Sequence, residues 1–539
     1  MTVLQRRVRR WARVLAPSIL AAATVSGTVF AASARQAASY DPNATITMAI
    51  NADPTFNLWS PTAYVESDNI DPLIFSDLTK FGLNGSPAPD LATSWSASKN
   101  GLTWTFHLQH GVKWQDGQPF TSADVVFTYE NIVLNKSLGA NQASNFTDLT
   151  SVTAAGPYTV LFHLKAPWAS LPAYLGWFAP ILPEHIFKGV KDPWTLASFD
   201  KQHPVGTGPY QVTKVVPGQS ITLTRNPSYF GPKPKIATII YQIVPQETTQ
   251  IADLISGDLN FIEVDQPQLV SRLKADPSLT IQRVPEQNYY YMALNQRSAP
   301  FNNVLVRQAL EYAINRPAII QGLLRGYGTV SNGPIAPIQA MYYDSKVASY
   351  PYNPTKALAL LKQAGYTKGA GGKLYKNGKP LTMYMPVGQY GYLVQAAELV
   401  QQYWQKIGVT VNFKVLEWNT FISDVIVKHQ FQGTIGWWIS PLDPDMYPYY
   451  SCASAATGYN FQGSCNAQLD KVMLAGRETA NPARRVAIYK QAQQLLAQGQ
   501  YLNFLWYPQM VDASSSNLHV PSVNINIALD NISLWYVTK

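Results

Sequence analysis

Residues 90–131 constrain the fold of this chain most strongly, because strand, turn and helix signals follow one another there without a break. Asp116-Gly117 predicts a tight turn, since glycine tolerates a positive φ. Thr121 as N-cap, with Asp124 three residues later, predicts the start of a helix. Before the turn, apolar side chains alternate with polar ones as in a half-buried strand: Leu102, Trp104, Phe106 and Leu108 alternate with Thr103, Thr105 and His107. No catalytic group is arranged here, so we interpret the segment as scaffold.

Residues 1–34 have the three parts of a secretory signal peptide. An apolar run from 14 to 32 leads to the small residues Ala32-Ser33-Ala34, which suit a cleavage site. An uncleaved membrane anchor is the alternative, since a span needs roughly 18–20 residues, but the interior Pro17 and Gly27 favour cleavage. No cysteine lies near the cleavage site, so we expect an exported protein, periplasmic or associated with the cell surface, without a lipid anchor. The charged start consists of Arg6, Arg7, Arg9, Arg10 and Arg13.

The charge of the chain becomes mild once this signal is set aside. The 41 basic and 32 acidic residues give +9, and the 36 basic residues that remain without the five signal arginines leave +4. Those lysines and arginines are scattered, whereas nucleic-acid binding needs a clustered basic face. We therefore expect no nucleic-acid partner. The remaining 505 residues exceed one hydrophobic core, so two or three domains are predicted.

The order of predicted elements indicates an α/β protein. A buried strand at 238–245 (TIIYQIVP) is followed by a helix (TTQIADLISGD) and another strand (NFIEV). A second unit begins near Tyr289-Tyr290-Tyr291, and helices are predicted over 306–324, with an interruption near Pro317, and over the segment that Asn353 caps and Gly365 ends. Further helix and strand signals alternate up to a helix over 484–498.

Cys452 and Cys465 are the only two cysteines, thirteen positions apart. An even count in an exported chain favours a disulfide, and closing so short a loop is worth about 3 kcal/mol. A metal pair is the alternative, but the nearest histidine is His429 and no ligand spacing is present.

Catalytic and nucleotide-binding motifs are missing from the sequence. There is no G-x-S-x-G, H-E-x-x-H, G-x-x-x-x-G-K-[ST] or dinucleotide glycine fingerprint. His107 and His110 are three apart, but on a strand and a turn, where a metal site is not expected. Catalytic triads need not be sequential, so the lack of a motif does not exclude an enzyme. We nevertheless interpret the chain as a binding protein without a metal or cofactor.

The ordered motif W-S…G-L-T-W-T-F-x-L…G-V-K-W-x-D-G-x-P-F-T-S-A-D-V-V-F resembles the extracytoplasmic solute-binding proteins of the peptide/nickel ABC-importer family. The string S-C-A-S…G-x-N…C around the cysteines also resembles dipeptide-binding members. The resemblance implies a two-lobe periplasmic-binding-protein fold that closes on its ligand by hinge motion. It further implies lobe I over 35–285 with a subdomain inserted at about 60–195, lobe II over 286–503, and a return of 504–539 to lobe I. A monomer that delivers its ligand to a membrane permease with a separate ATPase is expected.

The loop 439–450 follows the predicted strand GTIGWW and is the best ligand-contact candidate, since ligands of open α/β sheets bind at the carboxyl ends of strands. In peptide-binding relatives, an Asp four residues after the Gly of the G-W pair holds the α-amino group of the peptide. Ser440 occupies that place here. Oligopeptide-binding members also carry basic residues that face the ligand, and Val425 and Thr434 occupy those positions here. The tryptophans of the family's E-W and G-W pairs are kept as Trp418 and Trp437.

Asp443-Pro444-Asp445 resembles the D-P-D of the family, and we interpret it mainly as turn and helix-capping structure. The alternative is that one of these carboxylates, in place of the family's Asp, binds the ammonium group of the ligand. Tyr290 lies where the family chain crosses between lobes, and Trp59 lies in a loop (56–62) that we expect to face the cleft. The candidate ligand-binding residues are Trp437, Trp438, Ser440, Trp418, Asp443, Asp445, Tyr290 and Trp59.

Two ligand classes stay open at this point. Peptides, either di- or oligopeptides, are the expected ligand of an importer component of this kind. The alternative is a neutral oligosaccharide or another non-peptide solute, because aromatic rings and uncharged hydrogen-bond donors suit such ligands. A nickel chelate is a less favoured alternative. A secreted hydrolase with a cleft is a remote alternative of a different class.

Overall fold

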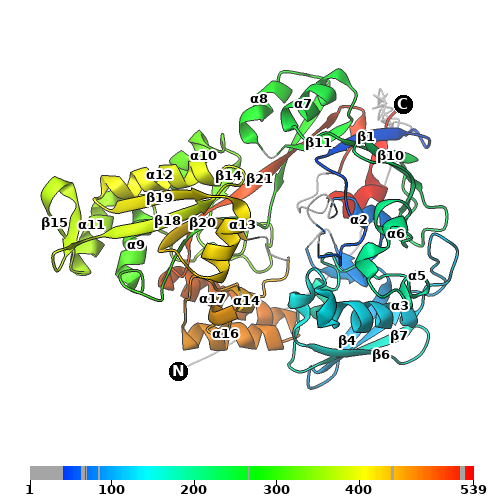
Figure 1. Ribbon diagram of the computed structural model, residues 1–539, viewed down its shortest axis with the longest axis horizontal. Helices are drawn as coiled ribbons and strands as arrows, with labels where there is room; N and C mark the ends of the chain where they lie inside the picture. The colour runs from blue at the N-terminus through cyan, green and yellow to red at the C-terminus, as the bar shows by residue number, and fades with distance from the viewer. Residues whose placement is uncertain are drawn as a thin grey trace, which may run out of the picture. The chain divides into compact units, whose positions relative to one another are not determined.

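The computed structural model describes residues 40–539, apart from 62, 64–66, 68, 83–84, 265, 439–441, 458 and 522–527. The predicted signal peptide and Ser440 lie outside the described residues. Helices and strands alternate along the described chain (Figure 1), which confirms the predicted α/β class.

The largest sheet of the described residues has the strand order β20-β13-β21-β11-β1-β10-β9-β8, and β12 and β14 also pair with β21. Its strands β1 and β10 run parallel, whereas β13 is antiparallel to both β20 and β21. The strand bounds are β1 Thr45–Ile50, β8 Tyr210–Val216, β9 Ser220–Arg225, β10 Thr238–Ile243, β11 Phe261–Val264, β12 Leu279–Pro285, β13 Tyr289–Leu294, β14 Gly328–Val330, β20 Gly433–Trp438 and β21 Asn503–Ser515.

Strand β21 links the two ends of this sheet. Its first half pairs with β13 and β14, and its second half, from Gln509 to Ser515, pairs with β11 and β12. Figure 1 shows it as one long strand. The consecutive strands β12 and β13 follow the same path in the opposite direction. Two antiparallel segments therefore connect the β20 end of the sheet with the β1 end.

The segment 90–131 forms the predicted strand, turn and helix. Strand β5 buries alternate residues and pairs with β4 and β7 in a four-stranded sheet of order β4-β5-β7-β6. Gly117 has φ +89° at the turn. Thr121 Oγ1 accepts from Ala123 N at 3.2 Å, and Thr121 N donates to Asp124 Oδ2 at 2.9 Å. The bounds are β4 Ala92–Ala97, β5 Thr103–Leu108, β6 Leu149–Ala154, β7 Thr159–Leu164 and α3 Ser122–Phe127, which continues as a π-helix over Thr128–Val133.

The remaining helices lie mainly between 300 and 500, where strands β18 and β19 flank helix α12 in a parallel β-α-β unit. The predicted interruption near Pro317 is confirmed, because separate helices form before and after Asn315, whose side chain caps the second one. Asn353 caps the helix that Gly365 ends, as predicted. The bounds are α9 Val304–Tyr312, α10 Arg316–Gly322, α11 Pro354–Gln363, β18 Thr382–Gly388, α12 Leu393–Lys406, β19 Thr410–Leu416, α13 Trp418–Phe421, α14 Tyr447–Tyr450, α16 Ala467–Glu478 and α17 Pro482–Gly499.

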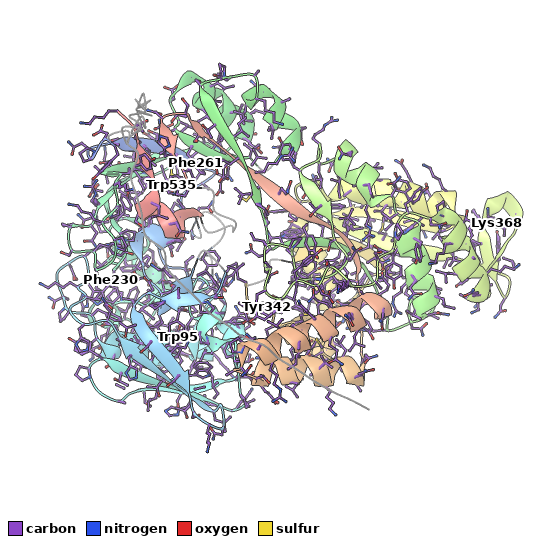
Figure 2. All side chains as sticks on the ribbon, turned by 180° about the vertical axis from the view of Figure 1, so that it is seen from behind. Trp95, Phe230, Phe261, Tyr342, Lys368 and Trp535 are labelled. Atoms are coloured by element: carbon purple, nitrogen blue, oxygen red, sulfur yellow. A yellow bond between two sulfur atoms is a disulfide. The ribbon has the colours of Figure 1, made fainter. Side chains whose placement is uncertain are left out.

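The buried apolar side chains form separate clusters. One contains residues between Ile46 and Phe261 together with Leu518, Val520, Ile532 and Trp535 near the C-terminus. The ring centroids of Trp535 and Phe261 lie 4.9 Å apart. Figure 2 labels both residues. Two further clusters are built almost entirely from residues between 289 and 507. The C-terminus thus packs with residues that precede 262 rather than with its neighbours in sequence.

Candidate functional site

The carboxyl ends of three strands between residues 380 and 440 lie side by side, at one edge of the fold. The parallel pair β18 and β19 ends with Gly388 opposite Leu416. Strand β20 runs beside β18 in the same direction, because Gln432 N donates to Tyr384 O at 3.1 Å and Thr434 Oγ1 donates to Pro386 O at 2.7 Å. The carboxyl ends of parallel strands are where open α/β folds bind their ligands.

A group of seven aromatic rings, here called the aromatic stack, lies at this edge. Strand pairing creates part of it, because Tyr290 lies opposite Trp437 on β20 and opposite Trp506 on β21. Its ring centroid is 6.1 Å from Trp437 and 5.2 Å from Trp506, with interplanar angles of 23° and 20°. The stack consists of Tyr290, Tyr390, Tyr392, Trp418, Phe421, Trp437 and Trp506.

The loops that follow β18 and β19 supply the other rings. Trp418 begins α13 and stacks on Trp437 at 5.4 Å, and Tyr390 stacks on Trp437 at 4.9 Å with an angle of 20°. Gly388 makes room for this arrangement, since a Cβ there would lie 2.7 Å from the Trp418 ring. The predicted residues Trp418, Trp437 and Tyr290 are therefore brought together, each half-buried.

Trp438 lies on the opposite face of β20, because successive side chains of a strand alternate. Its ring contacts Tyr449 and Tyr459, each at 5.4 Å, and Phe461 at 6.0 Å. The two neighbouring tryptophans of GTIGWW thus do not form one surface.

The carboxylates of the D-P-D are engaged in ion pairs. Asp443 accepts from Arg485 Nη1 and Nη2, each at 2.8 Å, and from Ser170 Oγ at 2.8 Å. Asp445 Oδ2 lies 3.4 Å from Arg477 Nη1. Burial raises the pKa of Asp445, while the Arg477 guanidinium lowers it. Turn structure, as predicted, is also present, since Asp443 Oδ1 accepts from Asp445 N at 3.0 Å.

These arginines also join segments that lie far apart in the sequence. Arg477 Nη2 lies 2.6 Å from Asp148 Oδ2, and the Arg477 carbonyl accepts from Ala169 N at 2.7 Å. Arg485 Nη2 donates to Ser170 Oγ at 3.0 Å. Helices α16 and α17 are thereby tied to residues near β6 and 168–170.

Val425 and Thr434, the places of the missing basic residues, are fully buried. The Thr434 hydroxyl donates to Pro386 O at 2.7 Å, so it serves the pairing of β18 and β20. Neither side chain presents a group to solvent.

Trp59 does not face a cleft, contrary to the expectation. Its ring is fully buried, and Nε1 donates to Pro180 O at 2.8 Å. Tyr129 meets the ring edge to face at 6.2 Å, and Phe146 lies 6.1 Å away. The large apolar ring gains more from this aromatic core than from a solvent-exposed loop.

The predicted disulfide between Cys452 and Cys465 is present in the structure, with an S–S distance of 2.10 Å. The enclosed Asn460 is buried, and its Nδ2 donates to Ser451 O at 2.8 Å and to Ser464 O at 2.7 Å. The loop carries Tyr459 and Phe461 against Trp438.

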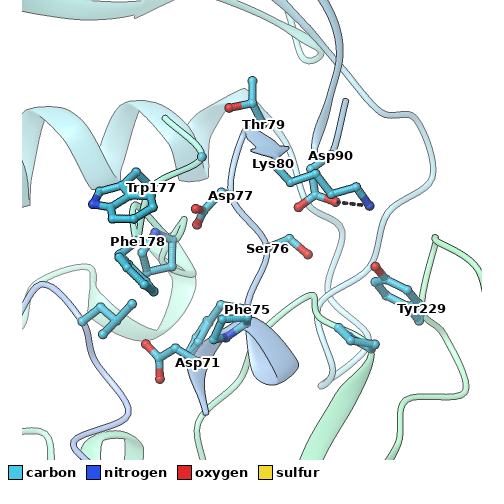
Figure 3. A pocket seen from close by; sticks show the side chains of 15 residues that line it. Asp71, Phe75, Ser76, Asp77, Thr79, Lys80, Asp90, Trp177, Phe178 and Tyr229 are labelled. Carbon is cyan, nitrogen blue, oxygen red and sulfur yellow. Dashed lines mark ion pairs between the residues drawn. The ribbon is translucent and has the colours of Figure 1, made fainter. Parts of the chain in front are cut away.

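A cavity of about 70 Å³ lies elsewhere, and its lining includes Phe75, Trp177 and Tyr229 (Figure 3). Asp71, Asp77, Asp90 and Lys80 line it together with the rings of residues such as Trp177. Lys80 Nζ lies 3.8 Å from Asp90 Oδ1. Burial raises the pKa of Asp90 to about 6, although Lys80 lowers it. No sequence signal distinguished this cavity, since its acidic residues are spread over the short helix α2 (Asp71–Ile74) and two loops.

No group of three or more His, Cys, Asp or Glu side chains within the described part of the chain could hold a metal ion. No described helix combines the length and apolar character needed to cross a membrane.

Comparisons with known proteins agree on one family. The model of the bacterial extracellular solute-binding proteins, family 5 Middle, matches residues 86–460. The oligopeptide-binding protein AppA of Bacillus subtilis (strain 168) is 30% identical over 478 residues, 88% of each chain. The dipeptide-binding protein of Escherichia coli (strain K12) is 31% identical over 443 residues, 78% of this chain and 81% of that one. The solved structure of Bacillus subtilis AppA in complex with a nonapeptide matches 93% of this chain and 100% of that chain, with a TM-score of 0.76 and 28% identity.

Proposed function

This chain belongs to the bacterial extracellular solute-binding proteins of family 5, and from that premise we propose that it captures peptides outside the cytoplasmic membrane as the binding component of an ABC importer. The observation that carries the proposal is the similarity to an oligopeptide-binding protein over 88% of both chains. The family is a class of non-catalytic solute-binding proteins with a two-lobe α/β fold. A permease with its ATPase would receive the ligand, and the protein itself would act as a monomer without catalysis.

The exported location follows from the predicted signal peptide at 1–34, which we propose is cleaved. We further propose lobe boundaries at 285 and 503, with a subdomain inserted at about 60–195 and a return of 504–539 to the first lobe. The paired segments β12–β13 and β21 support this division, because they alone connect the two ends of the large sheet among the described strands. Hinge closure at these segments would shrink the protein on binding. Small-angle scattering at saturating peptide should therefore give a smaller radius of gyration.

We propose that the aromatic stack holds the peptide by contact with its side chains, and that the termini are not gripped by full ion pairs. Asp443 and Asp445 already neutralise Arg485 and Arg477, so a ligand ammonium would have to displace a buried arginine. Replacing a charge-assisted hydrogen bond by a neutral one forfeits roughly 1–2 kcal/mol.

Mass spectrometry of ligand released from the exported protein by mild denaturation tests the proposal. Peptides are expected. A neutral oligosaccharide in their place would support the alternative ligand class, and turnover of an added substrate would support a hydrolase. Calorimetry then compares one peptide with its acetylated, amidated form in wild type and Trp437→Ala. If blocking the termini abolishes binding, the proposal about the termini is wrong.

A further inference from the structure

Tyr390 is the only ring of the aromatic stack that is largely open to solvent. Its side chain is 50% exposed, whereas the other six rings are half-buried or buried. It lies 4.9 Å from Trp437 and 5.1 Å from Trp418, with interplanar angles of 20° and 39°. A side chain exposed to this extent is accessible to a ligand, and an aromatic ring prefers another aromatic ring as its neighbour.

The backbone around Tyr390 is fixed at both sides. Gln389 N donates to Leu416 O at 2.8 Å, which holds the end of β18 against β19. Leu393 N donates to Tyr390 O at 3.1 Å at the start of α12. The ring therefore projects from a short connection between a strand and a helix. A group held in place before binding loses little conformational entropy when a ligand contacts it.

We propose that Tyr390 is a specificity-determining residue whose exposed ring stacks on an aromatic side chain of the bound peptide. The inference rests on the proposed peptide-binding function and adds a preference among peptides. An aromatic group extends the series of nearly parallel rings, and aromatic pairs gain stability beyond the area that they bury. An aliphatic side chain of equal size would gain only the free energy of burying its apolar surface. The expected discrimination is about two- to tenfold in affinity.

The experiment uses the full chain and a set of alanine tripeptides in which one position at a time carries phenylalanine, cyclohexylalanine or lysine. Calorimetry gives the affinities for wild type, Tyr390→Leu and Tyr390→Phe. Tyr390→Leu keeps an apolar side chain without a ring, and Tyr390→Phe is the matched control that loses only the hydroxyl. Near-UV circular dichroism and thermal unfolding check that the remaining stack is intact.

Wild type should bind one phenylalanine peptide about two- to tenfold more tightly than its cyclohexylalanine counterpart. Tyr390→Leu should reduce this ratio to about one, and Tyr390→Phe should retain it. Equal affinities for phenylalanine and cyclohexylalanine in wild type, a ratio that survives Tyr390→Leu, or a preference for lysine would overturn the inference and leave peptide binding standing. Failure of every peptide, all-alanine included, to bind wild type would overturn the proposed function and the inference with it.

Discussion

Asp443 and Arg485 form a two-point ion pair, in which Nη1 donates to Oδ2 and Nη2 to Oδ1, each at 2.8 Å. Both side chains are buried, and Ser170 donates to the same carboxylate from a distant part of the chain. The pair satisfies a charge that the interior would otherwise leave uncompensated. It therefore gives the D-P-D a structural role that needs no ligand.

Asp443→Asn should destabilise the protein by about 3–5 kcal/mol, because Arg485 then keeps a buried charge without its carboxylate. Urea unfolding measures the loss. The double variant Asp443→Asn/Arg485→Met should lose less free energy of unfolding than the two single variants lose together. Ser170→Ala is the matched control and should cost about 1 kcal/mol. An unchanged stability of Asp443→Asn, combined with a selective loss of peptides that have a free amino group, would instead assign Asp443 to the ligand.

Gly388→Ala should weaken peptide binding by about tenfold, since its Cβ would lie 2.7 Å from the Trp418 ring and force that ring out of the stack. Calorimetry measures the affinity, and near-UV circular dichroism reports the altered stacking. Gly322→Ala is the matched control, because nothing lies within 4 Å of a Cβ at that position. Equal affinities of the two variants would show that Trp418 does not contribute to binding.

Replacing both Cys452 and Cys465 by serine should lower the free energy of unfolding by about 3 kcal/mol, because the unfolded chain regains the freedom of the closed loop. Denaturant unfolding measures this free energy for the variant and for wild type. Affinity should change little, since the loop packs on Trp438 and not on the aromatic stack. Non-reducing peptide mapping that recovers both thiols free in wild type would contradict this prediction.

Asp90 should make the protein less stable as the pH rises from 4 to 7. Burial raises the pKa of Asp90 from 3.8 to about 6, so the folded state holds the proton more tightly than the unfolded state. This contribution is complete below pH 4 and is lost as the pH rises through about 6, a change of about 2–3 kcal/mol. The difference in unfolding free energy between wild type and Asp90→Asn, followed over this range, isolates it.

Lys80→Met provides the matched control for this titration. Lys80 lowers the pKa of Asp90, so its removal should move the loss of stability to a higher pH. A difference between wild type and Asp90→Asn that stays constant from pH 4 to 7 would contradict the prediction.

The sequence predicted those parts of the protein that depend on neighbouring residues. The strand, turn and helix of 90–131 rest on alternation, a glycine and a capping pair, all of which act within a few positions. The break before Pro317 and the cap at Asn353 are of the same kind. Period-2 alternation also implies that Trp437 and Trp438 lie on opposite faces of the strand, although both belong to the set of candidate ligand-binding residues.

The candidate site depends on partners that no local pattern specifies. Tyr390 and Trp506 join Trp437 from positions 47 residues before and 69 residues after it, because strand pairing and parallel strand ends bring them together. The one available signal for Tyr390 was its place directly after a strand. Trp59 lies in a segment without alternation, so its burial followed only from the packing of distant rings. The role of Asp443 likewise depended on Arg485, because charge compensation in the interior is set by proximity in space and not by distance along the chain.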